Sequence, residues 1–352
     1  LERVHHDRTP IGDRFNGGRE VGPIIDARIG LSEPHNGRRT VALLCFGGGL
    51  ELVYKPRPVT MEAAIERTAA WLTAHDPELA HVAPATLERA GYGYCSFVAP
   101  RACVSQAETE LFYRRLGALT ALLAALHATD CHADNFVARG PSPVLVDAET
   151  LLHPRLGSTP TDPLEATEVL AGEVLTSAGQ TIVYGGFDAG PVRGLAQNRP
   201  AFDAGVRSMR RLLRAELPAL LAHAGPLERG LMAQTRLVLR PTEMYARLLG
   251  HRLSARSLAA PDRGLSVCAR LLRRFEDASI GADAWAAVRD AELAALDRAD
   301  IPYLLVDAAN GDVTDLAGHV LAPAAFAPAR VRLGLDPDQE GSSGAPRPLA
   351  AG

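Results

Sequence analysis

Three polar side chains in the middle of the chain have types and spacing that suit phosphoryl transfer. Asp130 and Asn135 stand five residues apart in one polar loop, and Asp147 follows a short apolar hairpin. Phosphoryl transfer needs a carboxylate that orients the attacking hydroxyl, with an amide and a second carboxylate that hold Mg²⁺ on the nucleotide phosphates. Protein kinases place these groups in the same order. The pattern predicts a site for ATP and Mg²⁺.

A fourth candidate is Lys55, the only lysine among 37 basic residues. Its ammonium is a compact charge, unlike the planar fork of arginine, and kinases use a strand lysine to bind nucleotide phosphates. Each feature has a plainer interpretation, because Asp and Asn are common in turns and Asp147 could cap a helix. The joint occurrence of Lys55, Asp130, Asn135 and Asp147 in this order favours a functional site.

The remaining sequence excludes several other classes of protein. It contains no P-loop pattern, no HExxH and no clustered Cys and His, so a Walker-type ATPase and a zinc enzyme are not predicted. Five scattered cysteines without a CxxC pair fit a reducing compartment. A net charge of -4 argues against a nucleic-acid partner. The N-terminus lacks a signal peptide and the longest apolar stretch, 116–126, is too short for a membrane span, so we expect a cytoplasmic protein.

Hydrophobic periodicity predicts the elements that would position these residues. Two strands, 40–46 and 50–54, form a hairpin around Gly47–Gly49 and bring Lys55 to the end of the second strand. A helix at 60–75, with Thr60 as its N-cap, and a strand at 94–98 follow.

Beyond residue 100 the pattern becomes helical. Segment 105–127 has sustained helical periodicity, a small hairpin follows at 136–146, and further helices are predicted at 205–223, 228–249 and 282–299. The sequence therefore predicts an α+β fold of two lobes: a small β-rich lobe over residues 1–100 and a mainly helical large lobe over 101–336. The tail, 337–352, is rich in Pro, Gly, Ser and Ala and is predicted to be disordered.

A family resemblance covers nearly the whole chain. The stretch LHATDCHADNFVARGPSPVLVDAETLLHP, Leu126–Pro154, resembles the active-site core of the dehydratase domains of class II (LanM-type) lanthipeptide synthetases. Five other stretches resemble the same family in the same order: Leu50–Arg57, Gly91–Val98, Phe112–Leu123, Thr235–Leu249 and Ala299–Leu304. The resemblance implies a kinase-like fold related to lipid kinases. It also implies an enzyme that phosphorylates Ser and Thr of a precursor peptide from ATP and then eliminates the phosphate.

The resemblance also implies roles for individual residues. The phosphorylation set would be Lys55, Asp130, His132, Asn135, Asp147 and Glu149, with Lys55 on the nucleotide phosphates, Asp130 on the hydroxyl, and Asn135, Asp147 and Glu149 on Mg²⁺. The elimination set would include Arg236 and Thr242, with Arg240 nearby as a possible third group. From spacing alone, Arg236 and Arg240 instead predict the polar face of a helix.

An Asp-x-His pair of the family matches Glu33 and His35, so a longer acidic arm stands where the family has Asp. Family members also have a longer N-terminal region and a C-terminal cyclase domain, so we expect either a fragment or a split dehydratase with a separate cyclase. The expected partner is a precursor peptide with a leader. Two alternatives remain open: a peptide Ser/Thr kinase without elimination, and a non-catalytic remnant that only binds the precursor peptide.

Overall fold

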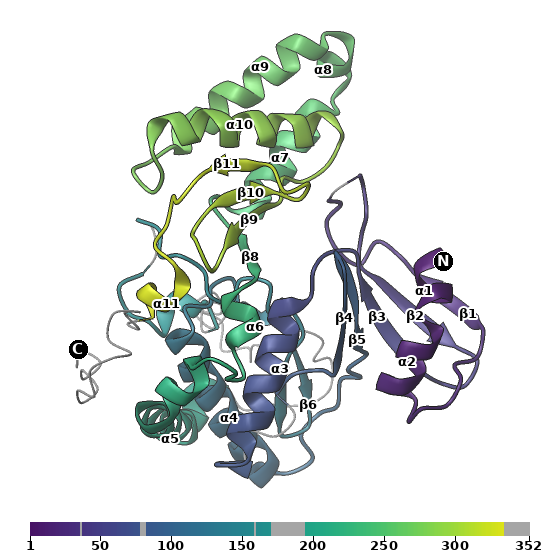
Figure 1. Ribbon diagram of the computed structural model, residues 1–352, viewed down its shortest axis with the longest axis vertical. Coiled ribbons are helices and arrows are strands. Elements are labelled where there is room, and N and C mark those ends of the chain that lie inside the picture. Colours follow the sequence, from purple (N-terminus) through teal and green to yellow (C-terminus); the bar gives the residue numbers. More distant parts are fainter. Residues whose placement is uncertain (36, 78–81, 158–159, 170–193, 334–352) are drawn as a thin grey trace.

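The computed structural model describes residues 1–35, 37–77, 82–157, 160–169 and 194–333. These residues form a mixed α+β fold, with an antiparallel five-stranded sheet in the N-terminal part and a mainly helical region after it (Figure 1). Within the described ranges, no helix is both long and apolar enough to cross a membrane. The predicted tail at 337–352 lies outside the described residues.

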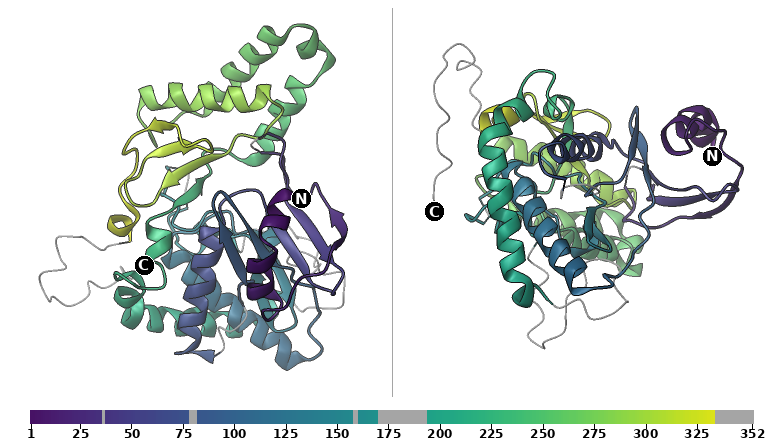
Figure 2. Two further views of the ribbon diagram at one scale, coloured as in Figure 1. Left: turned by 45° about the vertical axis from the view of Figure 1, so that its right-hand side comes forward. Right: turned by 90° about the horizontal axis from the view of Figure 1, so that it is seen from below.

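The first sheet has the order β1-β2-β3-β5-β4. Its strands are β1 (Ile24–Arg28), β2 (Ala42–Phe46), β3 (Glu51–Lys55), β4 (Thr86–Arg89) and β5 (Tyr92–Ser96). The predicted hairpin is confirmed: β2 pairs with β3, and Gly49 adopts a φ of 81° in the turn, which glycine reaches without steric cost. Helices α1 (Glu2–His6) and α2 (Arg8–Phe15) lie against one face of this sheet (Figure 2).

Three long helices form the main core. They are α3 (Thr60–Thr73), α4 (Gln106–Ala125) and α5 (Leu195–Leu221), which lies alongside α4 (Figure 2). The two helices approach closely at Gly117, where an added Cβ would lie 2.1 Å from the backbone oxygen of Phe202. Val59, not Thr60, is the N-cap residue of α3, so that part of the prediction is wrong.

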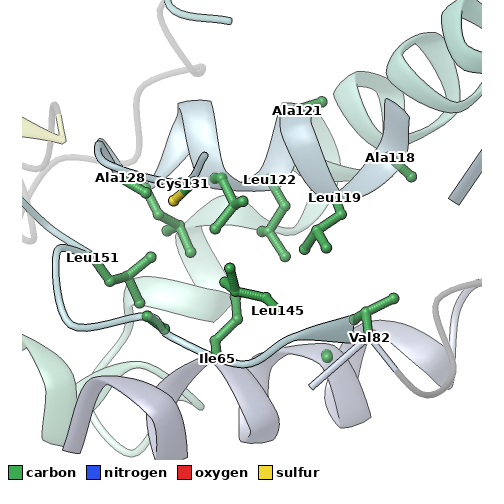
Figure 3. Close-up of a cluster of buried hydrophobic side chains, with 14 of the residues drawn as sticks. Ile65, Val82, Ala118, Leu119, Ala121, Leu122, Ala128, Cys131, Leu145 and Leu151 are labelled. Atoms are coloured by element: carbon green, nitrogen blue, oxygen red, sulfur yellow. The ribbon is translucent and has the colours of Figure 1, made fainter. Parts of the chain in front are cut away.

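The small hairpin is also confirmed, as β6 (Phe136–Arg139) and β7 (Ser142–Leu145), and a 3₁₀ turn at Ala133–Asn135 precedes it. Figure 3 shows how Leu145 of β7 meets Ile65 of α3 and Leu119 and Leu122 of α4 in one buried apolar cluster. The loops on either side of the hairpin, which carry Asp130 and Asp147, are therefore fixed to the helical core.

The predicted helix at 228–249 is wrong. That segment forms α6 (Glu228–Leu231), β8 (Gln234–Leu237) and α7 (Thr242–Arg252). Side chains alternate between partly and fully buried along β8, and Pro241 precedes the next helix, so the local pattern is that of a strand. Thr235 and Leu237 are the buried members of that alternation.

Strand β8 belongs to a second antiparallel sheet that was not predicted. Its order is β11-β10-β9-β8, with β9 at Leu304–Asp307, β10 at Val313–Asp315 and β11 at Val320–Ala322. Four helices accompany this sheet in the upper part of Figure 1: α7, α8 (Ala255–Ala259), α9 (Pro261–Leu272) and α10 (Ala282–Asp297). A short helix, α11 (Ala329–Arg332), follows. The region after residue 100 is thus less purely helical than the sequence predicts.

Candidate functional site

A cleft of about 750 Å³ brings together residues that are far apart in the sequence. Nine of the ten predicted site residues line it: Glu33, His35, Asp130, His132, Asn135, Asp147, Glu149, Arg236 and Thr242. The tenth, Lys55, is 4% exposed and lies just behind the wall formed by Asp147. The loops that flank the β6–β7 hairpin, the segment before β2, strand β8 and the start of α7 supply these residues.

Lys55 is the last residue of β3 and is held by three oxygen atoms. Its Nζ lies 2.9 Å from Oε1 of Glu62 and 3.5 Å from Oδ2 of Asp147, and it donates a hydrogen bond of 2.8 Å to the carbonyl of Val146. Burial works against the ammonium, but Asp147 and Glu62 outweigh it and raise the pKa of Lys55. Lys55 is therefore a charged group at the inner end of the cleft.

Two neighbours of Lys55 were missed as site residues. Glu62, in the first turn of α3, is 1% exposed and contacts both Lys55 and Arg57. Arg57 lies 2.6 Å from Asp147 and 2.7 Å from Glu149, so it links three carboxylates. The sequence signal for Arg57 was its place two residues after the only lysine. Glu62 carried no signal beyond its position near a helix start.

The loop before the hairpin carries Asp130 and Asn135. Asp130 has a φ of 55°, and its carbonyl accepts a hydrogen bond of 2.6 Å from Nδ2 of Asn135. Burial raises the pKa of the Asp130 carboxyl to about 6, although Arg236 and His132 oppose the rise. Nε2 of His132 lies 3.5 Å from Oδ1 of Asp130. A carboxyl with this pKa can accept a proton near neutral pH.

Glu149 is the charged centre of the cleft wall. One carboxylate oxygen, Oε2, lies 2.7 Å from Nε of Arg57 and accepts a hydrogen bond of 2.7 Å from the Tyr303 hydroxyl, and the other, Oε1, pairs with Arg236. Burial alone would raise the pKa of Glu149, but Arg236 and Arg57 hold it well below its usual range. Glu149 is therefore ionised, and both of its oxygens have partners.

Arg236 and Arg240 lie in different environments, and the helix face predicted from their spacing is wrong because β8 contains Arg236. The Arg236 guanidinium pairs with Glu149 and lies 5.1 Å from the centre of the Tyr303 ring. Arg240 is directed into the core, where its Nε and Nη2 lie 2.7 and 3.2 Å from the two oxygens of Glu292. Glu292 therefore binds the Nε and Nη2 edge that a phosphate would otherwise bind, so the contacts of Arg240 are those of a buried ion pair.

The remaining predicted residues lie at the mouth of the same cleft. His35, half-buried on the loop before β2, has its Nδ1 2.8 Å from the carbonyl oxygen of Ile301, and its ring meets Tyr303 edge-on at 5.0 Å. Burial lowers the pKa of His35 and favours the neutral ring. Glu33 is exposed, and Thr242 begins α7. Tyr303, which touches both His35 and Arg236, was not identified as a site residue from the sequence.

The cleft also offers oxygen atoms of the kind that Mg²⁺ requires. Magnesium prefers hard oxygen ligands and retains several waters, so one or two protein ligands together with phosphate oxygens suffice. Asp147 offers a carboxylate on the cleft wall, and Asn135 offers an amide oxygen because its nitrogen is directed to Asp130. Among the described residues, no group of three or more His, Cys, Asp and Glu could hold a metal ion alone. Asp147 and Asn135 fit a magnesium that arrives with a nucleotide.

The fold and the cleft define a mixed α+β domain with a charged central site, and comparison with known proteins gives its family. The chain belongs to the family described as a domain of unknown function, DUF4135, whose model matches residues 1–179 and 195–307. A shorter part is 31% identical over 68 residues to the lacticin 481/lactococcin biosynthesis protein LcnDR2 of Lactococcus lactis subsp. lactis. That alignment covers 19% of this chain and 7% of the relative's length.

Proposed function

We propose that this chain dehydrates Ser and Thr side chains of a precursor peptide, first by phosphorylation from ATP and then by elimination of the phosphate. The observation that carries the proposal is the convergence, on one cleft, of residues from the segment before β2, the hairpin loops, β8 and the start of α7. The resemblance to LanM-type dehydratases and the similarity to a lacticin 481/lactococcin biosynthesis protein support the same substrate class.

Contacts around Lys55 support the phosphorylation step. Kinases hold their nucleotide-binding lysine by an ion pair with a glutamate on a neighbouring helix. Lys55 of β3 and Glu62 of α3 form such a pair at 2.9 Å, which also supports a kinase-like arrangement of the first sheet and α3. Asp147 and Asn135 would hold Mg²⁺, which neutralises charge on the transferred phosphoryl group. Asp130, whose carboxyl has a raised pKa, would accept the proton of the attacking hydroxyl.

A second group of residues supports elimination. In that step a base removes the α-proton, the Cβ–O bond breaks, and phosphate leaves with the bonding electrons. His35, held in its neutral form by burial, is the base, and Arg236 offers a guanidinium that binds phosphate. Thr242, at the start of α7, lines the same cleft and would donate its hydroxyl to the leaving phosphate. Phosphorylated peptide would therefore not need to leave the cleft between the two steps.

Mass spectrometry of the peptide product tests the proposal. The protein is incubated with ATP, Mg²⁺ and a leader-bearing precursor peptide, and the peptide mass is compared with that from a reaction without ATP. We expect peptide lighter by one or more waters. A peptide of unchanged mass, from protein that binds the peptide, would refute the enzymatic function and support the binding remnant.

A kinase without elimination is the second candidate, and the position of Glu33 favours it. Glu33 is exposed, and the ring of His35 contacts the carbonyl of Ile301, so among the residues that the structure describes no carboxylate is hydrogen-bonded to the histidine. This candidate predicts a stable phosphopeptide as the end product of the same reaction.

A further inference from the structure

The segment between α10 and β9 has contacts that the proposed function does not yet use. It runs from Ala299 to Tyr303 and lies against the loop that carries His35. The loop precedes β2 in the first sheet, while the segment leads into β9 of the second sheet. The contacts between them therefore join two parts of the chain that are more than 260 residues apart.

Asp300 holds the loop through its backbone. Its carboxylate is 1% exposed and accepts hydrogen bonds of 2.9 Å from the N–H of Gly37 and 2.7 Å from the N–H of Arg38. Gly37 and Arg38 both have a positive φ, of 82° and 62°. Consecutive N–H groups in a turn form a concave site for an anion, and here a buried carboxylate fills it.

Ile301 holds His35 itself. The N–H of Ile301 donates a hydrogen bond of 2.8 Å to the carbonyl of Pro34, and the carbonyl of Ile301 lies 2.8 Å from Nδ1 of His35. A carbonyl only accepts hydrogen bonds, so Nδ1 carries the proton in the neutral ring. Nε2 is then the nitrogen with a free electron pair, which a base requires. Tyr303, two residues on, packs against the ring of His35 and under the guanidinium of Arg236.

We propose that Asp300 is a positioning residue for the elimination step, because it fixes the loop so that His35 presents Nε2 beside Arg236. This inference rests on the proposed function. The phosphorylation residues are held by other contacts, since Lys55 binds Glu62 and Asn135 binds Asp130. Loss of the Asp300 carboxylate should therefore slow elimination and leave phosphorylation intact.

The test compares Asp300→Asn with Asp297→Asn in the reaction with ATP, Mg²⁺ and precursor peptide. The amide keeps the size of Asp300 but loses its charge, and its NH2 group sets a donor against one of the two loop N–H groups, which donate to different oxygens of Asp300. We expect elimination to slow by about tenfold or more, as misplacement of a catalytic group by about 1 Å can do, with phosphopeptide accumulating. Phosphorylation at the rate of the unaltered protein shows that the variant is folded.

Asp297 is the matched control because it is the last residue of α10, three residues before Asp300, and pairs with Arg252, outside the loop contact. Asp297→Asn should dehydrate the peptide as the unaltered protein does. If Asp300→Asn fails to fold, Asp300→Glu keeps the charge and shifts it by one methylene, and it should show a smaller defect confined to elimination. Dehydration at the unaltered rate by either folded Asp300 variant overturns the inference.

A second measurement does not depend on activity. Two-dimensional ¹H–¹⁵N spectra of the histidine rings report which nitrogen carries the proton, and the signal of His35 is identified by its loss in His35→Gln. The unaltered protein should show the Nδ1–H form, and Asp300→Asn should show a mixture of both forms. An unchanged ring signal in Asp300→Asn overturns the positioning role. A protein without peptide activity but with the expected ring signals would refute the proposed function alone.

Discussion

Arg57 and Glu149 form an ion pair, with 2.7 Å between Nε and Oε2, that connects the two groups of residues in the cleft. Arg57 also binds Asp147, which belongs to the proposed phosphorylation set, while Glu149 binds Arg236, which belongs to the proposed elimination set. The pair is thus part of the wall that both steps share. Together with Arg236, which has the larger effect, Arg57 lowers the pKa of Glu149 and keeps its carboxylate ionised.

Loss of Arg57 should impair both steps. Arg57→Met leaves the carboxylates of Glu62, Asp147 and Glu149 short of one cation, and Glu62 is buried, so the free energy of unfolding should fall by about 3 kcal/mol. Urea denaturation measures this loss, and phosphopeptide and dehydrated peptide are quantified at a temperature where the variant is folded. A folded variant with normal rates of phosphorylation and elimination would contradict the claim that the Arg57–Glu149 pair serves both steps. Arg67→Met, at a partly exposed ion pair, serves as the control.

Substitution of Arg236 should affect phosphate elimination, whereas substitution of Arg240 should affect the free energy of unfolding. Arg236→Met removes a guanidinium that lines the cleft, so phosphopeptide should accumulate while phosphorylation continues. Arg240→Met breaks a fully buried pair with Glu292 and should lower the free energy of unfolding by about 3–5 kcal/mol. Its remaining folded fraction should still eliminate phosphate. Phosphopeptide accumulation by the Arg240 variant would restore Arg240 to the elimination set.

The buried His153 should make the protein sensitive to acid. Its Nε2 accepts a hydrogen bond of 3.0 Å from the N–H of Val238, and burial lowers the pKa of His153 from 6.5 to about 4. The unfolded chain therefore binds more protons below pH 6.5, so the free energy of unfolding falls as the pH drops from about 6.5 to 4, by up to about 3 kcal/mol.

His153→Gln keeps an acceptor for Val238 and cannot titrate in this range. Its urea midpoint should therefore change less between pH 7 and pH 4.5 than that of the unaltered protein. Parallel pH curves for the two proteins would rule out His153 as a source of the acid sensitivity.

The end of α10 offers a stabilising substitution. Ala299 adopts a φ of 62°, and the N–H of Asp300 bonds back to the carbonyl of Ala295, as in a helix end that usually uses glycine. Ala299→Gly relieves the steric cost of the left-handed conformation, so the free energy of unfolding should rise by about 0.5–1 kcal/mol. Thermal and urea unfolding measure the gain. A decrease would mean that the entropy lost by glycine on folding outweighs the relief.

The confirmed secondary-structure predictions are those that depend on local sequence patterns. The β2–β3 hairpin follows from alternating apolar residues around a glycine turn, and α4 from a long helical period with Ser105, whose side chain caps its first turn. Lys55, Asp130, Asn135 and Asp147 were predicted as site residues because kinases keep similar groups in the same order. The three loop residues among them line the cleft, and their roles stay a prediction.

The features that the sequence did not predict depend on contacts between residues that are far apart in the sequence. β8 is four residues long and becomes a strand only beside β9, about 70 residues later, so helical periodicity across 228–249 predicted the wrong element. Glu62, Arg57 and Tyr303 have ordinary local surroundings, and their importance lies in the ion pairs and ring contacts that tertiary packing creates. Glu149 was predicted as a metal ligand, whereas its contacts suit the positioning of two arginines.

A quenched time course of the peptide reaction, followed by mass spectrometry, tests the central claim most directly. The protein is mixed with ATP, Mg²⁺ and precursor peptide, and samples are stopped at successive times for the unaltered protein and for Asp130→Asn. A phosphopeptide should appear first and decay into dehydrated peptide in the unaltered protein, and neither product should form with Asp130→Asn. Dehydrated peptide that forms without ATP, or equally fast with Asp130→Asn, would contradict the account.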